Sequence, residues 1–135
     1  MIYLLDTNIC IHFFRGEFNL LQKFDEVNLS NCCISEITLA ELSFGAESSS
    51  NPEKNHLLIT SFIENITVLP IFSAINHYAK EKVRLRRQGL MISDFDLLIG
   101  STAVSYDLIM VTENTKEFKR IKALELENWV DRASK

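Results

Sequence analysis

Short, continuous runs of apolar residues alternate along this chain with longer segments of helical periodicity. Runs of this kind are typical of strands that are buried on both faces of a parallel sheet. We expect strands near 2–5, 31–34, 67–70, 108–111 and 124–126. Strands that alternate with helices predict an α/β fold with three layers, α/β/α, around a central and mainly parallel sheet.

The expected helices are bounded by capping and breaking residues. In the first half they cover 9–14, 18–27, and Ser35 to about Phe44, where Gly45 closes the helix. A further helix starts at Pro52 and includes 59–66. In the second half they cover Ser73 to about Arg87, where Gly89 closes the helix, Ser93 to about Ser105, and 114–120. The apolar residues of 9–14 and 59–66 pack in the core on the simplest interpretation. An exposed remainder would suit a partner peptide or a dimer contact.

Length and composition limit the class of protein. A chain of 135 residues fits one domain, 1–135, and a hydrophobic share of 47% excludes a disordered protein. We expect a cytoplasmic protein, because no apolar run is long enough to span a membrane and the N-terminus does not resemble a signal peptide. Cys10, Cys32 and Cys33 form no CxxC pair, which argues against zinc and favours reduced core residues.

The basic residues are concentrated although the net charge is −4. The segments 80–87 and 116–122 contain nine of the 14 lysines and arginines but only two of the 18 acidic residues. The candidates for contacts to phosphates in these segments are Lys80, Arg84, Arg87, Lys116 and Lys119. Such clusters are equally consistent with solvated helix faces and with contacts to phosphates.

Two acidic residues stand out in the first half of the chain. Asp6 follows the first strand, where it fits either a site at the end of the sheet or an N-cap of the next helix. Glu41 falls between Ile37 and Phe44 on a helix face that we expect to be buried, which favours a site role over a surface ion pair.

The second half offers further oxygen ligands. Asp96 begins an apolar helix, although Ser93-x-x-Asp96 is also the spacing of a capping box. Asp94 fits an ordinary first-turn acid or a ligand that contacts a metal through water. Asn114 and Glu117 follow the strand at 108–111 and are candidates for a helix cap or for metal ligands.

These acids come from separate elements, and the carboxyl ends of parallel strands share one edge of a sheet. Converging carboxylates would hold a hard divalent cation such as Mg²⁺ or Mn²⁺. A cation of this kind activates water for attack on a phosphodiester. Without the cation, the acids would repel one another and raise at least one pKa.

Five motifs resemble those of one family in order and spacing. They are Leu5-Asp6-Thr7-Asn8, Ser35 to Leu42 with Phe44-Gly45, Asp94 to Ile99, Val111 to Asn114 with Glu117-Phe118, and Leu124 to Trp129. Over nearly its full length the chain resembles VapC-type members of the PIN-domain family. It departs from them at Asn114, where many relatives have Asp, and Glu117 is a candidate to supply that charge.

The resemblance implies a toxin of a toxin–antitoxin pair that is a metal-dependent endoribonuclease, with Asp6, Glu41 and Asp96 as catalytic residues and ligands of Mg²⁺ or Mn²⁺. It also implies a VapB-type antitoxin partner, a homodimer, and a structured RNA such as tRNA as substrate. The alternative is a PIN-like module that binds RNA or partners with weak catalysis. A phosphatase-like hydrolase is disfavoured because Asn8 stands where a second acid is expected, and a receiver domain because it lacks a clear acceptor Asp and late Lys.

Overall fold

The computed structural model describes residues 1–133. Its centre is a five-stranded sheet in the order β3-β2-β1-β4-β5, and every neighbouring pair is parallel. The strands are β1 (Tyr3–Leu5), β2 (Cys32–Ser35), β3 (Thr67–Leu69), β4 (Ile109–Val111) and β5 (Glu125–Glu127). The predicted strands and the parallel sheet are confirmed, with bounds that differ by at most one residue.

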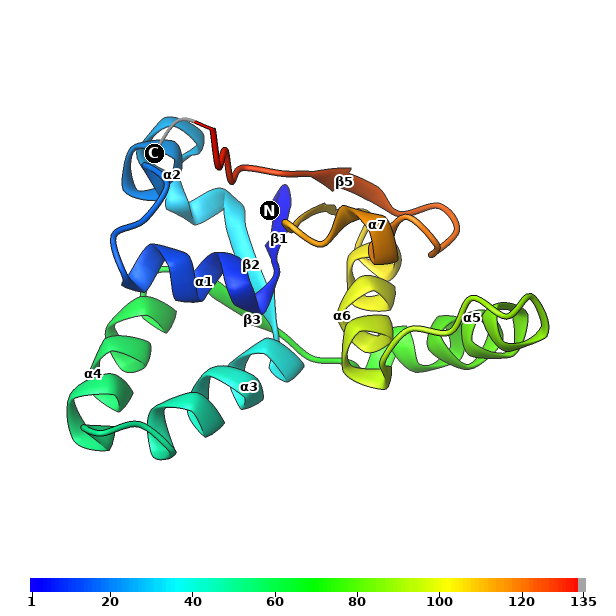
Figure 1. Cartoon of the computed structure of the whole chain (residues 1–135), viewed down its shortest axis with the longest axis horizontal. Helices are drawn as coiled ribbons and strands as arrows, with labels where there is room; N and C mark the ends of the chain where they lie inside the picture. Colours follow the sequence, from blue (N-terminus) through cyan, green and yellow to red (C-terminus); the bar gives the residue numbers. More distant parts are fainter. Residues whose placement is uncertain (134–135) are drawn as a thin grey trace.

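Helices cover both faces of this sheet (Figure 1). They are α1 (Thr7–Phe14), α2 (Leu20–Val27), α3 (Glu36–Glu47), α4 (Pro52–Ile63), α5 (Ile75–Arg87), α6 (Asp94–Ser105) and α7 (Thr115–Phe118), with the 3-10 turns η1 (Leu29–Asn31) and η2 (Phe72–Ala74). In Figure 1, α1 to α4 lie to the left of β1, and α5 to α7 lie to its right. The predicted three-layer α/β/α arrangement is therefore confirmed.

Alternation along the strands divides the core into two clusters. Leu5 and Cys32 pack with α1 to α4, whereas Leu4 and Cys33 pack with α5 to α7. All three cysteines are buried and free, as predicted, and burial raises the pKa of each thiol. No helix in residues 1–133 has the length and apolar character of a membrane span.

Several predicted helix boundaries are wrong. The helix from Pro52 was expected to include 59–66, but α4 ends at Ile63. Gly45 does not close its helix, since α3 continues to Glu47 and Ser48 is its C-cap. Ser73 does not open a helix, because residues 72–74 form the 3-10 turn η2 and α5 begins at Ile75. The helix expected from residue 18 begins at Leu20, and Asn19 has a left-handed backbone with φ 55°.

Other boundary residues act as predicted. Pro52 occupies the first turn of α4, and the Ser93 side chain accepts a hydrogen bond from the backbone of Asp96 at the start of α6. Gly89 has φ +68° just beyond α5, a backbone conformation that glycine adopts without steric cost. The single domain over 1–135 remains a prediction, because residues 134–135 lie outside the described part.

Candidate active site

Asp6 is held at the end of β1 by two hydrogen bonds. Its Oδ1 accepts from the backbone N–H of Thr7 at 2.8 Å, and its Oδ2 accepts from the hydroxyl of Thr112 at 2.8 Å. Asp6 is therefore the N-cap of α1 as well as a buried carboxyl group. Because β1 and β4 are neighbours, Thr112 lies directly beside it.

Burial raises the pKa of Asp6 from 3.8 to about 6, against the lowering effect of its bonds with Thr112 and Thr7. The charges of Asp96 and Glu41 raise the pKa of Asp6 further. Burial also raises the pKa of Asp96, and the charges of Glu41 and Glu117 add to this effect. The acids at 6, 41, 96 and 117 therefore form one electrostatic group.

Glu41 joins this group from α3, but its helix face is not buried as predicted. Phe44 is 74% exposed and Ala40 is also exposed. The buried stripe of α3 is formed instead by Thr38, Leu42 and Ala46, and Glu41 lies at its edge. The Glu41 carboxylate accepts a hydrogen bond of 2.6 Å from the hydroxyl of Thr7.

Asp94 and Asp96 have different partners although both lie in the first turn of α6. The Asp94 carboxylate accepts from the Lys82 ammonium at 2.8 Å and from the Tyr78 hydroxyl at 2.9 Å. These bonds lower the pKa of Asp94. The structure therefore turns Asp94 toward α5, away from the acids that surround Asp6.

Asn114 contributes its backbone to the site. Its N–H donates to the Thr112 hydroxyl at 3.0 Å, and its carbonyl accepts from the Phe118 N–H. The predicted side-chain cap at Asn114 does not form in the structure. Glu117 follows on α7, and its charge reaches Asp96.

The basic candidates fall into two classes. The Arg84 guanidinium donates to both oxygens of Glu81, at 2.7 and 2.8 Å, and to the backbone carbonyl of Arg120 at 2.7 Å. Glu81 is only 6% exposed, so Arg84 neutralises a buried acid. Lys80, Arg87, Lys116 and Lys119 are exposed.

The chemistry of the acidic group fits a hard cation. Among residues 1–133, no lysine, arginine or histidine forms an ion pair with Asp6, Glu41 or Asp96. In the same residues, no group of three or more Asp, Glu, His or Cys side chains lies close enough together to hold a metal ion. The site thus supplies oxygen ligands and uncompensated negative charge, without a preformed cage.

Two threonines of the site, Thr7 and Thr38, were missed by sequence reasoning as partners of an acid. The Thr7 hydroxyl lies 3.2 Å from that of Thr38 in addition to its bond with Glu41. Thr38 is entirely buried on α3. The sequence shows only that a threonine follows Asp6 and that another precedes Glu41 by three residues, which does not reveal that α1 and α3 meet there.

Comparison with known proteins identifies the family. The PIN-domain model matches residues 3–124. "Ribonuclease VapC2" of Haemophilus influenzae is 41% identical over 132 residues, which cover 95% of this chain and 98% of that protein. The chain belongs to the PIN-domain family, among the VapC ribonucleases.

Further relatives agree with this family in sequence and in fold. The "tRNA(fMet)-specific endonuclease VapC" of Shigella flexneri is 39% identical over 128 residues, covering 94% of this chain and 97% of that protein. The crystal structure of DNA-bound VapBC from Salmonella typhimurium superposes with a TM-score of 0.89 at 36% identity, covering 96% of this chain and 98% of the matched one. The PIN fold predicted from the motifs is confirmed.

Proposed function

We propose that this chain is the endoribonuclease toxin of a toxin–antitoxin pair, and that Asp6, Glu41 and Asp96 are its catalytic acids. One observation carries the proposal: the charges of Glu41 and Asp96, which lie on other elements, raise the pKa of Asp6, and none of the three acids has a basic partner in the described residues. Membership of the VapC ribonucleases supports RNA as the substrate. We also propose a cytoplasmic location, where cellular RNA is available as substrate.

We propose Mg²⁺ or Mn²⁺ as the cofactor, with Asp6, Glu41 and Asp96 as its ligands. Such an ion would polarise the scissile phosphate and lower the pKa of an attacking water. Glu117 is a candidate for a further ligand because its charge already reaches Asp96, and Asn114 stays a weaker candidate. Asp94 is left out because Lys82 neutralises it.

The chain's own groups prepare the site for hydrolysis. Thr112 and the Thr7 N–H orient the Asp6 carboxylate, so its lone pairs are fixed before substrate arrives. With a pKa of about 6, the carboxyl of Asp6 is mainly ionised at neutral pH. Hydrolysis of the phosphodiester would leave a 3′-hydroxyl and a 5′-phosphate.

We propose that the RNA backbone lies across the exposed basic residues Lys80, Arg87, Lys116 and Lys119. Lys116 and Lys119 flank Glu117, whose charge reaches Asp96, so they are placed to hold phosphates next to the site. Arg84 is not included, because its guanidinium is bound to Glu81 and to the backbone of Arg120. The substrate we propose is a structured RNA, with tRNA(fMet) as the first to test because of the named relative.

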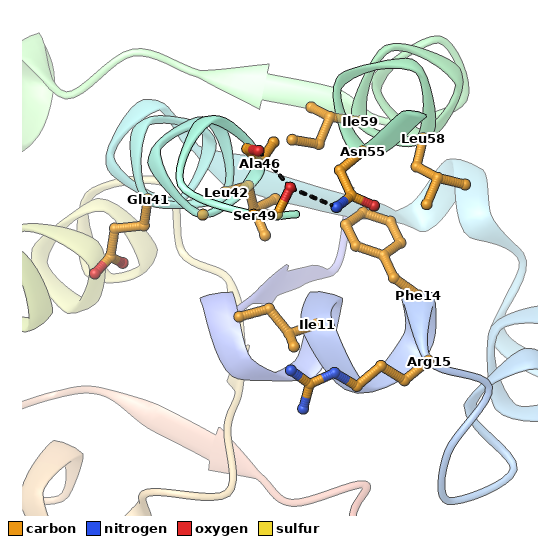
Figure 2. Close-up of a pocket in the computed structure, with 11 residues that line it drawn as sticks. Ile11, Phe14, Arg15, Glu41, Leu42, Ala46, Ser49, Asn55, Leu58 and Ile59 are labelled. Carbon is orange, nitrogen blue, oxygen red and sulfur yellow. Dashed lines mark hydrogen bonds between the residues drawn. The ribbon is translucent and has the colours of Figure 1, made fainter. Parts of the chain in front are cut away.

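We further propose that a VapB-type antitoxin binds the groove between α1, α3 and α4 (Figure 2). This cavity has a volume of about 300 Å³, and Ile11, Leu42 and Ile59 line it. Glu41 lies at its border, so an occupant would reach the acidic site. Several solved structures of relatives are VapBC complexes.

A homodimer is the assembly we propose. Three large apolar side chains are exposed to solvent: Phe72 (85%), Ile75 (47%) and Phe95 (50%). They are the first candidates for the contact because η2 packs against α6. Light scattering of the antitoxin-free protein and of Phe72→Ser would test this assembly.

The test of the nuclease function uses purified, antitoxin-free protein. Cleavage of tRNA(fMet) and of total tRNA is measured with Mg²⁺, with Mn²⁺ and with EDTA, beside Asp6→Asn and Asp96→Asn. Asp94→Asn is the matched control, since it lies two residues from Asp96 and is paired with Lys82. We expect discrete products that require a cation, are lost in the first two variants and persist in the third. Cleavage that survives EDTA and both substitutions would refute the proposal.

A further inference from the structure

A buried pair of hydroxyl groups connects α1 to α3 beneath the acidic site. Thr7 is the first residue of α1 and is 9% exposed, and Thr38 on α3 is wholly buried. The Thr7 oxygen lies 3.2 Å from the Thr38 oxygen and 2.6 Å from Oε1 of Glu41. Three polar groups from two helices thus form one short chain.

Counting protons fixes the direction of these bonds. An ionised carboxylate only accepts hydrogen bonds, whereas each threonine hydroxyl has one proton to donate. The Thr7 hydroxyl must therefore donate its proton to Glu41. The Thr38 hydroxyl must then donate to Thr7, and the order Thr38 to Thr7 to Glu41 follows. Bonds in such a chain polarise and strengthen one another.

These two hydrogen bonds restrict the rotation of the Glu41 side chain. Glu41 lies at the edge of the buried stripe of α3, beside the exposed Ala40 and Phe44. Within residues 1–133, the Thr7 hydroxyl is the one hydrogen-bond donor found at the Glu41 carboxylate. Thr7 also follows Asp6 directly, and its N–H holds Asp6 Oδ1. One residue therefore bonds to both acids.

We infer that Thr7 is a positioning residue that fixes Glu41 relative to Asp6, and that Thr38 acts through Thr7 by orienting its hydroxyl. The inference deepens the proposed nuclease function and rests on it. The positioning role depends on the hydroxyl groups, and valine tests this because it has the same shape as threonine but no hydrogen-bond donor. Serine keeps the donor and loses only the methyl group.

The experiment compares Thr7→Val, Thr7→Ser, Thr38→Val and the double valine variant. Thr102→Val is the matched control: Thr102 is also wholly buried, and its hydroxyl donates to the Leu98 carbonyl within α6 and not to a carboxylate. Three quantities are measured: Mn²⁺ affinity of the RNA-free protein by electron paramagnetic resonance, kcat and KM for tRNA, and the urea midpoint of unfolding.

We expect Thr7→Val to weaken Mn²⁺ binding and to lower kcat by roughly 10–100-fold, the usual effect of removing a partner of a ligand. KM should change far less, and Thr7→Ser should restore most of both losses. Thr38→Val should act in the same direction with a smaller effect. The double variant should unfold at a higher urea concentration than Thr7→Val, because it no longer buries an unpaired Thr38 hydroxyl, yet should bind Mn²⁺ no better.

The possible failures are distinguishable. Wild-type protein that neither binds Mn²⁺ nor cleaves RNA would overturn the proposed function and this inference together. Wild-type activity with Thr7→Val unchanged in Mn²⁺ affinity and kcat would overturn the inference alone. The same holds if Thr102→Val loses as much as Thr7→Val, or if Thr7→Ser is as impaired as Thr7→Val.

Discussion

Replacing Asp6 with asparagine should make the metal-free protein more stable, relative to wild type, as the pH rises from 4 to 8. Asp6 is a buried carboxyl group whose pKa is raised from 3.8 to about 6, mainly by burial. Its charged form is thus disfavoured in the folded state, and asparagine removes that charge. The Thr7 N–H can still donate to the amide oxygen, whereas the amide NH2 can only donate to the Thr112 hydroxyl. The buried Thr112 proton therefore loses its acceptor, at a cost in stability that does not depend on pH.

The size and sign of the effect follow from proton linkage. A folded-state pKa above the unfolded value means that the carboxyl stabilises the fold fully below pH 3.8, and that this contribution is lost as the pH rises through about 6. At about 1.4 kcal/mol per tenfold change in proton affinity, the loss is about 3 kcal/mol. The free energy of unfolding of Asp6→Asn minus that of wild type should therefore increase by up to about 3 kcal/mol between pH 4 and pH 8.

Urea unfolding in EDTA between pH 4 and pH 8 measures this difference. Trp129 is the single tryptophan and packs against Tyr3 and Phe24, so its fluorescence reports on the core. Subtracting wild type from the variant removes the contribution of titrating groups that do not interact with Asp6. These include Asp94 and Glu113, whose pKa values are lowered by hydrogen bonds from Lys82 and Arg132, respectively. A difference between variant and wild type that does not vary with pH, or that decreases toward pH 8, would refute the reasoning.

Three further predictions concern the cation, a buried ion pair and the basic surface. Mg²⁺ or Mn²⁺ should raise the urea midpoint of wild type and of Asp94→Asn but not of Asp6→Asn or Asp96→Asn; equal stabilisation of all four would contradict the ligand assignment. Arg84→Met should destabilise the fold by about 3 kcal/mol because it leaves Glu81 buried without its cation, whereas Lys80→Met on the same helix should change stability by less than about 0.5 kcal/mol in the same unfolding assay. In the inactive Asp96→Asn background, tRNA binding should be weakened by either Lys116→Ala or Lys119→Ala, with no change in stability. Each substitution should also reduce the slope of log Kd against log salt concentration by about 0.7–0.9. An unchanged slope would place the RNA elsewhere.

The fold could be predicted because its strands are short apolar runs with polar ends. Leu4 and Leu5 face opposite helical layers, and this requires both to be apolar, so the run at 2–5 is visible in the sequence. Helix ends were harder to place. Gly45 suggested a stop, but packing of Ala46 in the core carries α3 through it to Glu47. A local preference at one glycine is worth about 1 kcal/mol, which burial of an adjacent turn overrides.

The acids of the site were found for reasons of unequal quality. Asp6 lies at the end of its strand and Asp96 at the start of its helix, as predicted. Asp6 is also the N-cap of α1, and the backbone of Asp96 donates to the N-cap Ser93, so a capping role and a site role are compatible for both residues. Glu41 was chosen from a helix face that proved exposed at Phe44, so its motif and not its expected burial identified it. The hydroxyl partners Thr7 and Thr38 depend on the contact between α1 and α3, which periodicity within either helix does not encode.

The distribution of ion pairs explains why the site remains negative in a chain with concentrated basic residues. Each strong pair on this side of the sheet neutralises another acid: Lys82 binds Asp94, and Arg84 binds Glu81. Asp96 lies only two residues from Asp94 yet receives no basic partner in the described residues. The acids therefore repel one another and lower the stability of the metal-free fold, and a bound cation would recover that stability because it replaces repulsion with attraction. Binding of the cofactor and stability of the fold are thus expected to rise and fall together.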